Sequence, residues 1–171
     1  MQHDLRVRKH PRLKSHDYSQ NGYYYITICT QGKLPALSRV VGQGLAPAAV
    51  ALTPMGKIIE EQLLYLPNRY PFVEIDKYVI MPNHIHAIII FGDEANQTAG
   101  ASPRPTLMNV VGAFKSLSTR LCNQSDNMQG RKIWQASFYE QVIRDKEGYQ
   151  SARQYIDENP AKWVEDCYYT P

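Results

Sequence analysis

Apolar residues recur along the chain with two periods, one typical of strands and one typical of helices. Runs rich in β-branched and aromatic residues, which favour strands, occupy 23–30, 72–81, 84–91 and the second half of 133–143. Apolar residues at helical spacing occupy 55–66 and 106–121. A last helix is predicted over 145–158, where Asp145 can cap its start and Pro160 stops it. The predicted order is strand, helix, strand, strand, helix, strand, followed by a C-terminal helix.

Turn and loop signals separate these elements. Thr53-Pro54 supplies a helix cap and a proline at the first helical position, and Pro67 marks the expected end of that helix. Pro82-Asn83 separates two apolar runs and predicts a hairpin turn. Two stretches rich in glycine, alanine, proline or polar residues are predicted to be loops or insertions: 35–51 and 92–105.

The order of elements is that of the split βαβ motif, so the expected fold class is α+β. The expected architecture is ferredoxin-like, an antiparallel sheet with helices on one face and an added C-terminal helix. The 171 residues are enough for one ordinary domain and leave little room for a second. We therefore expect a single domain over 1–171, in which 1–20 is a basic arm.

Composition excludes several classes of protein without selecting a function. Apolar residues make up 43% of the chain and charged residues 20%, as in globular proteins. The sequence contains neither a run of about 18 apolar residues nor a secretory signal, so we expect no membrane span. Three widely spaced cysteines without a CxxC pair favour free thiols and a cytoplasmic protein. The net charge of +3 permits a nucleic-acid partner but does not require one.

Five basic residues lie within the first 20 positions, with little apolar patterning around them: Arg6, Arg8, Lys9, Arg12 and Lys14. Such an arm can contact the phosphate groups of a nucleic acid. It can equally be a solvated, partly disordered tail. The sequence of the arm leaves both interpretations open.

His84 and His86 are separated by one apolar residue at the start of a predicted strand. Residues i and i+2 of a strand point to the same face, so both imidazoles project together. Buried histidines need hydrogen bonds, water or a metal ion as partners. Because two histidines do not complete a metal site, this spacing alone favours ordinary, hydrogen-bonded strand histidines.

Tyrosine is overrepresented, with 12 Tyr beside 4 Phe and 2 Trp. In the last predicted helix, Tyr155 and Asn159 are four residues apart and lie on the flank of an apolar stripe formed by Tyr149, Ala152 and Ile156. A tyrosine and an amide thus project side by side from the edge of a packed face. Taken alone, the pair favours a partly buried tyrosine and an asparagine that ends the helix.

Five segments resemble, in order, the motifs of one enzyme family. The HUH motif (histidine, hydrophobic, histidine) of single-tyrosine transposases resembles MPNHIHAIIIF, and their tyrosine-helix motif, Tyr-Ile-x-x-Asn-Pro, is similar to YIDENPAKW. Three further segments resemble the REP-associated tyrosine transposases, which are relatives of the insertion-sequence transposases. RLKSHDYSQNGYYYITICT resembles their N-terminal arm and first strand, VGAFKSLSTR resembles their second helix, and IWQASFYEQVIRD resembles their fourth strand. The resemblance covers most of the chain except the variable loops at 35–51 and 92–105.

The resemblance implies a chemistry and the residues that carry it. His84 and His86 would bind a divalent metal ion, Mg2+ or Mn2+, with Asn159 at the position of a third ligand. Tyr155 would attack single-stranded DNA and form a 5′-phosphotyrosine beside a free 3′-OH. The residues implied to contact DNA are Arg6, Arg8, Lys9, Arg12, Lys14, Lys115 and Arg120. The implied partners are single-stranded DNA hairpins, and the implied location is the cytoplasm, at the nucleoid.

Other interpretations stay open beside this one. A catalytically inactive protein of the same fold would bind single-stranded DNA or hairpins without cutting them. A replication or plasmid-transfer initiator with the same motif is less favoured, because such initiators tend to be larger and to carry an additional domain. Both a monomer and a homodimer are compatible with the resemblance, because insertion-sequence relatives form dimers whereas REP-associated relatives can act as monomers.

Overall fold

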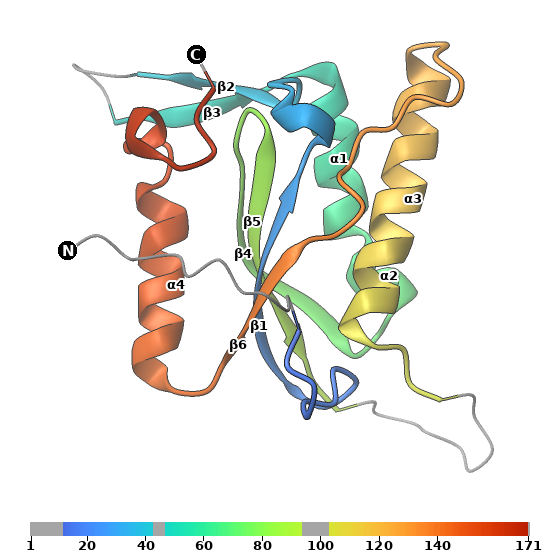
Figure 1. Ribbon diagram of the computed structural model, residues 1–171, viewed down its shortest axis with the longest axis vertical. Helices are drawn as coiled ribbons and strands as arrows, with labels where there is room; N and C mark the ends of the chain where they lie inside the picture. The colour runs from blue at the N-terminus through green and yellow to red at the C-terminus, as the bar shows by residue number, and fades with distance from the viewer. Residues whose placement is uncertain (1–11, 43–46, 94–102, 171) are drawn as a thin grey trace.

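The computed structural model of the chain describes residues 12–42, 47–93 and 103–170 (Figure 1). Its centre is a four-stranded antiparallel sheet of β1 (Gly22–Cys29), β4 (Val73–Ile80), β5 (His84–Phe91) and β6 (Tyr139–Ile143). The strands lie in the order β4-β5-β1-β6, which places the first strand of the sheet between the third and the fourth. This is the split βαβ order, and it confirms the expected ferredoxin-like α+β class.

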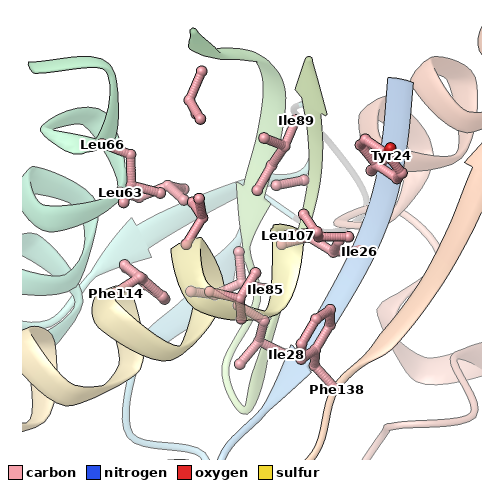
Figure 2. Close-up of a cluster of buried hydrophobic side chains, with 14 of the residues drawn as sticks. Tyr24, Ile26, Ile28, Leu63, Leu66, Ile85, Ile89, Leu107, Phe114 and Phe138 are labelled. Carbon is pink, nitrogen blue, oxygen red and sulfur yellow. The ribbon is translucent and has the colours of Figure 1, made fainter. Parts of the chain in front are cut away.

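One face of the sheet is covered by three helices: α1 (Pro54–Leu64), the short α2 (Leu66–Arg69) and α3 (Leu107–Ser125). Alternate strand positions supply the sheet's side of this core, among them Ile26, Ile85 and Ile89 (Figure 2). Leu63 of α1 and Phe114 of α3 pack onto them from the helices. Because side chains alternate along a strand, the residues between these positions point to the opposite face.

The opposite face is covered by α4 (Lys146–Glu158) and by the chain that follows it, which includes the one-turn helix η2 (Trp163–Glu165). Tyr25 and Ile88 of the sheet pack there with Ile156 of α4. The expectation of helices on one face therefore holds for α1, α2 and α3. The C-terminal helix, which carries the candidate tyrosine, lies on the other face.

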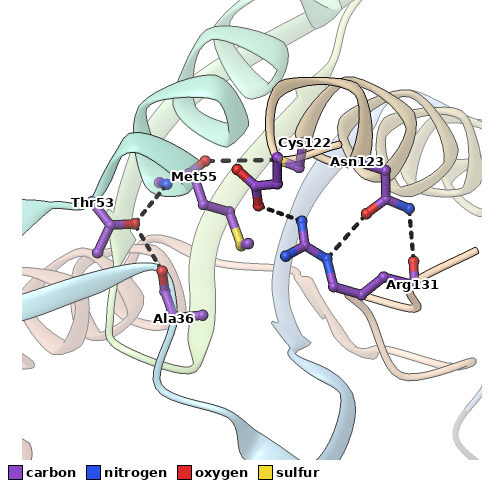
Figure 3. Close-up of polar contacts among 8 residues, drawn as sticks. Ala36, Thr53, Met55, Cys122, Asn123 and Arg131 are labelled. Carbon is purple, nitrogen blue, oxygen red and sulfur yellow. Dashed lines mark hydrogen bonds and ion pairs between the residues drawn. The ribbon is translucent and has the colours of Figure 1, made fainter. Parts of the chain in front are cut away.

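Hydrogen bonds hold α1 and α3 to the chain segments next to them. The Thr53 hydroxyl accepts a hydrogen bond from the Gly56 N–H (3.0 Å) and donates one to the Ala36 carbonyl (2.7 Å; Figure 3). Thr53 thus caps α1, as the sequence predicts, and ties its start to the preceding chain. Near the end of α3, Asn123 and Arg131 exchange two hydrogen bonds of 3.0 Å (Figure 3).

Two expectations from the sequence are wrong. The stretch 35–51 contains an antiparallel ribbon of two strands, β2 (Ser38–Val41) and β3 (Ala49–Leu52), rather than only a loop or insertion. Val40 and Val50 pair in this ribbon and pack against the core on the α4 side, and strands of four residues are too short to show a clear alternation. Pro67 lies in the first turn of α2 instead of ending α1, because proline is tolerated at a helix start.

The other predicted elements lie where the pattern placed them. Of the predicted loop at 92–105, positions 94–102 lie outside the described residues. All three cysteines are free thiols, as expected. Among the described residues, no helix combines the length and the apolar character that crossing a membrane requires.

Candidate active site

Two buried histidines lie at the start of β5 and point to the α4 side of the sheet. His84 and His86 are 0% and 1% exposed, and their Nε2 atoms are 3.0 Å apart. At this distance, two N–H groups or two bare lone pairs would repel each other, so the nitrogens must share a proton or a cation. The two imidazoles lie on one face, as their i, i+2 spacing predicts.

Hydrogen bonds at the other ring nitrogens orient both imidazoles. His84 Nδ1 lies 2.8 Å from Asn83 Oδ1, and because an amide oxygen only accepts, Nδ1 carries the proton and Nε2 a lone pair. His86 Nδ1 lies 2.7 Å from the Tyr25 hydroxyl and 2.9 Å from the Thr27 hydroxyl. Either hydroxyl can accept a proton from Nδ1, which leaves His86 Nε2 available to a cation.

Burial keeps both histidines neutral near physiological pH. It lowers the pKa of His84, although the nearby Asp166 carboxylate acts in the opposite direction. It also lowers the pKa of His86, and the neighbouring His84 adds to this effect. The neutral imidazole is the form that binds metal ions, so the pair is prepared as ligands rather than as positive charges.

Asp166 and Asn159 bring oxygen atoms to the histidine pair. A carboxylate oxygen of Asp166 and one nitrogen of each histidine all lie within 4.8 Å of one another. Asn159 donates its Nδ2 to Asp166 (2.9 Å), whereas its buried Oδ1 has no hydrogen-bond partner among the described residues. Two imidazoles, a carboxylate and a spare amide oxygen suit Mn2+ and, with phosphate or water oxygens added, Mg2+. The residues therefore fit a divalent metal ion.

Tyr155 stands on α4 beside the histidine pair. Its ring centroid is 5.2 Å from that of His86, and its hydroxyl is 3.5 Å from an oxygen of Asp166. The helix starts where the sequence predicts, with the Asp145 carboxylate accepting a hydrogen bond from the Gly148 N–H (2.7 Å). Burial, with a further contribution from the Asp166 charge, raises the pKa of Tyr155. The phenol is therefore protonated at neutral pH, and with 38% of its surface exposed it is reachable from solvent.

The chain after α4 supplies contacts that the sequence did not predict. The Tyr168 ring lies against the His84 ring (4.6 Å between centroids), and Asn83 Nδ2 donates to the Tyr168 carbonyl (2.8 Å). Asp166 belongs to the same segment, and no motif or regular spacing marks it in the sequence. The only local signal is Pro160, which prevents α4 from continuing and allows the chain to turn back over the site.

The described residues among those predicted to contact DNA do not gather at the histidine pair. Lys115 and Arg120 lie on α3, on the opposite side of the sheet, where Lys115 donates to three successive main-chain carbonyls before β6 (2.5–3.3 Å). Arg12 stacks over Phe138 of that same core (4.9 Å), and Lys14 is exposed. The remaining predicted residues, Arg6, Arg8 and Lys9, lie outside the described part of the chain. A DNA strand that contacted both α3 and the histidines would have to pass around an edge of the sheet.

Comparisons with known proteins place the chain in a family and identify its fold. No family model matches the sequence. The chain is 30% identical to an uncharacterized protein of Haemophilus influenzae over 174 aligned positions, which span 95% of this chain and 93% of that protein. It also resembles the solved structure of a REP-associated tyrosine transposase bound to a REP hairpin, with a TM-score of 0.54 at 19% identity, over 89% of this chain and 74% of that one. The chain therefore belongs to the family of the Haemophilus influenzae protein and has the fold of the REP-associated tyrosine transposases.

Proposed function

We propose that this protein cuts and rejoins single-stranded DNA as a transposase, with Tyr155 as the nucleophile and a divalent metal ion at His84 and His86. The observation that carries the proposal is the position of Tyr155, whose ring lies 5.2 Å from that of His86. A reachable phenol beside two neutral metal-binding nitrogens is the arrangement that metal-assisted attack on a phosphate requires. The similarity of fold to a transposase supports the same class of reaction.

The reaction conserves the phosphodiester bond energy. The Tyr155 oxygen attacks the phosphorus atom, and the bond between phosphorus and the 3′ oxygen breaks as the new bond forms. The phenol loses its proton, and the departing 3′ oxygen gains one to become a 3′-OH. The 5′-phosphotyrosine product can then react with the 3′-OH of another strand, which releases Tyr155 and rejoins the DNA without any further co-reactant.

We propose that the Asp166 carboxylate receives the proton of Tyr155. The hydroxyl donates toward the Asp166 carboxylate over 3.5 Å, a contact that a small movement would shorten. The raised pKa of Tyr155 makes such an acceptor necessary, because a protonated phenol is a weak nucleophile. A divalent ion bound at the site would add positive charge that polarises the phosphate and favours the phenolate.

We infer that the Nε2 atoms of His84 and His86 and oxygen atoms of Asp166 and Asn159 are the metal ligands. The unpaired Oδ1 of Asn159 supports its role, and the proximity of the Asp166 carboxylate to both imidazoles supports a second oxygen ligand. The carboxylate adds a negative charge, which favours a hard divalent cation such as Mg2+ or Mn2+.

The proposed substrate is a single-stranded DNA hairpin. The support is the solved transposase of the same fold, which is bound to a REP hairpin. Tyr155 lies beside His86 within one chain, so the proposed site needs no residue from a second copy. A DNA substrate in turn implies work in the cytoplasm, at the nucleoid.

The proposal is tested with hairpin oligonucleotides taken from the DNA that flanks the gene. They are incubated with the protein and Mn2+, and the products are separated on a denaturing gel. The unmodified protein should form a covalent protein–DNA adduct that disappears with a chelator, in Tyr155→Phe and in His84→Ala. Tyr65→Phe, at an exposed tyrosine at the end of α1, is the matched control and should keep the adduct.

Two results would count against the proposal. An adduct at full yield in Tyr155→Phe would reject Tyr155 as the nucleophile. Salt-dependent hairpin binding with no adduct would instead identify a catalytically inactive binding protein of the same fold.

A further inference from the structure

A β-bulge in β4 turns two successive charged residues toward α4. Ile75 pairs with Ile89, whereas Lys77 pairs with Ile88, so Asp76 is an extra residue in the ladder. Ile89 belongs to the core under α1 and α3, and Ile88 belongs to the core under α4. The extra residue therefore lets Asp76 and Lys77 both reach the α4 side, which ordinary alternation along a strand would forbid.

Both charged residues hold α4. The Asp76 carboxylate accepts hydrogen bonds from the Tyr149 hydroxyl (3.0 and 3.1 Å) and from Arg153 Nη1 (2.8 and 2.9 Å). Lys77 forms an ion pair with Asp157. The Asp76 side chain is only 14% exposed, so its contacts are shielded better than those of a surface ion pair.

The residues of α4 that bind β4 form one stripe, and Tyr155 lies on the other flank of the helix. Tyr149, Arg153 and Asp157 follow at intervals of four, so each is turned by about 40° from the one before. Ile156 faces the sheet between this stripe and Tyr155, which is turned by about 160° from Arg153. A rotation of α4 by about 20° would move a side chain on its surface by about 2 Å, since the helix with its side chains is about 5–6 Å in radius.

Apolar packing alone gives α4 little resistance to such a rotation. Among the residues of α4, all of which are described, Ile156 is the only buried one. Tyr149 and Ala152 pack against the same core but are only partly buried, so apolar packing holds the angle of the helix about its own axis weakly. The polar contacts to β4 add to this packing and oppose the rotation directly.

We propose that Asp76 is a positioning residue: with Lys77, it fixes the rotation of α4 and so holds the Tyr155 hydroxyl at the histidine pair. This inference rests on the proposed function for its catalytic consequence, but the placement of Tyr155 can be measured without catalysis. Misplacing a reacting group by about 1 Å can slow a reaction by about a hundredfold, so loss of these contacts should slow adduct formation.

The kinetic test measures adduct formation in a single turnover, at saturating hairpin with Mn2+, beside the Kd of the hairpin. Asp76→Ala should slow adduct formation by about tenfold or more, while the Kd changes by less than about twofold. Lys77→Asp should also slow it, and the double exchange Lys77→Asp with Asp157→Lys should restore it, because the ion pair is rebuilt with reversed polarity. Asp126→Ala removes an ion pair with Arg131 beyond α3 and should change neither quantity.

A second measurement follows the position of Tyr155 itself. In protein containing fluorotyrosine, the Tyr155 fluorine resonance is assigned by its absence in Tyr155→Phe. It should shift in Asp76→Ala and in Lys77→Asp, and it should return in the double exchange, because the ring moves relative to His86. If the unmodified protein forms no adduct, the proposed function fails while this resonance still decides the positioning role.

The outcomes that would overturn the positioning role are specific. They are an unchanged adduct rate and an unchanged resonance in Asp76→Ala, or no recovery of either in the double exchange. If Asp76→Ala does not fold, Asp76→Asn replaces it, because the amide keeps one acceptor oxygen for Arg153 while it loses the charge and the second acceptor oxygen. A parallel fall of rate, hairpin affinity and thermal stability in these variants would show a structural role only.

Discussion

Replacing Asn83 with alanine should weaken metal binding, although the ion itself would contact the histidines. Asn83 Oδ1 accepts the proton of His84 Nδ1 at 2.8 Å, and its Nδ2 donates to the Tyr168 carbonyl at 2.8 Å. Asn83 and His84 are both fully buried, so water cannot easily take the place of the lost amide. Without that acceptor, the proton is free to move to Nε2, where a metal ligand needs a lone pair.

The expected loss is large because the site is buried. Removing the hydrogen-bond partner of a metal-binding histidine typically weakens metal affinity by about 10–100-fold. That range corresponds to about 1.4–2.7 kcal/mol. A buried N–H left without an acceptor costs about 1–3 kcal/mol, so we expect Asn83→Ala in the upper half of the range. Asn83→Asp keeps an acceptor oxygen for His84 but loses the Nδ2 donor to the Tyr168 carbonyl, and it should bind the metal more tightly than Asn83→Ala.

Titration of the metal-free protein with Mn2+ near neutral pH, with free Mn2+ followed by its electron paramagnetic resonance signal, measures these affinities. Asn123→Ala is the control, because Asn123 makes comparable hydrogen bonds to Arg131 beyond the other face of the sheet. Its Mn2+ affinity should equal that of the unmodified protein. Equal weakening in Asn83→Ala and Asn83→Asp would refute the reasoning, because only the alanine variant lacks an acceptor for His84 Nδ1.

Three further predictions concern stability, each measured by urea unfolding. Gly56→Ala should destabilise by about 1–3 kcal/mol, since the added Cβ would lie 2.0 Å from the Leu37 carbonyl oxygen; an unchanged midpoint would contradict this. Thr106→Ala should cost about 1 kcal/mol by removing the cap of α3, and Thr106→Ser should recover most of it. Burial lowers the pKa of both His84 and His86, so the unfolded chain binds more protons. The metal-free protein should therefore lose stability as the pH falls below about 6.5, by about 1.4 kcal/mol per pH unit for each histidine, and His86→Gln should reduce that slope.

The main helices and strands were predictable because each buries one face, and this gives its apolar residues a regular spacing in the sequence. Ile26, Ile85 and Ile89 mark strands through alternation, and Asp145 and Pro160 mark the two ends of α4 through local backbone chemistry. The sequence also predicts that His84 and His86 lie on one face of the sheet, since this depends only on the two-residue period of a strand.

Other features depend on tertiary contacts that no local pattern encodes. Asp166 reaches the histidines because the chain turns back after α4, and the direction of that turn is set by packing of rings such as Tyr168 on His84. The ribbon of β2 and β3 is held by Val40 and Val50 against the same core. The role of Lys115 could not be predicted from the sequence either. A cation outside an apolar stripe can bind a phosphate or, as here, donate hydrogen bonds to main-chain carbonyls.

The bulge at Asp76 also has a consequence for solubility. β4 is an edge strand of the main sheet, and the outer N–H and C=O groups of an edge strand are a template for pairing with a second chain. The extra residue interrupts the regular spacing of those groups, so a second strand could not pair with β4 in continuous register. The irregularity that holds α4 should therefore also protect the protein against edge-to-edge aggregation.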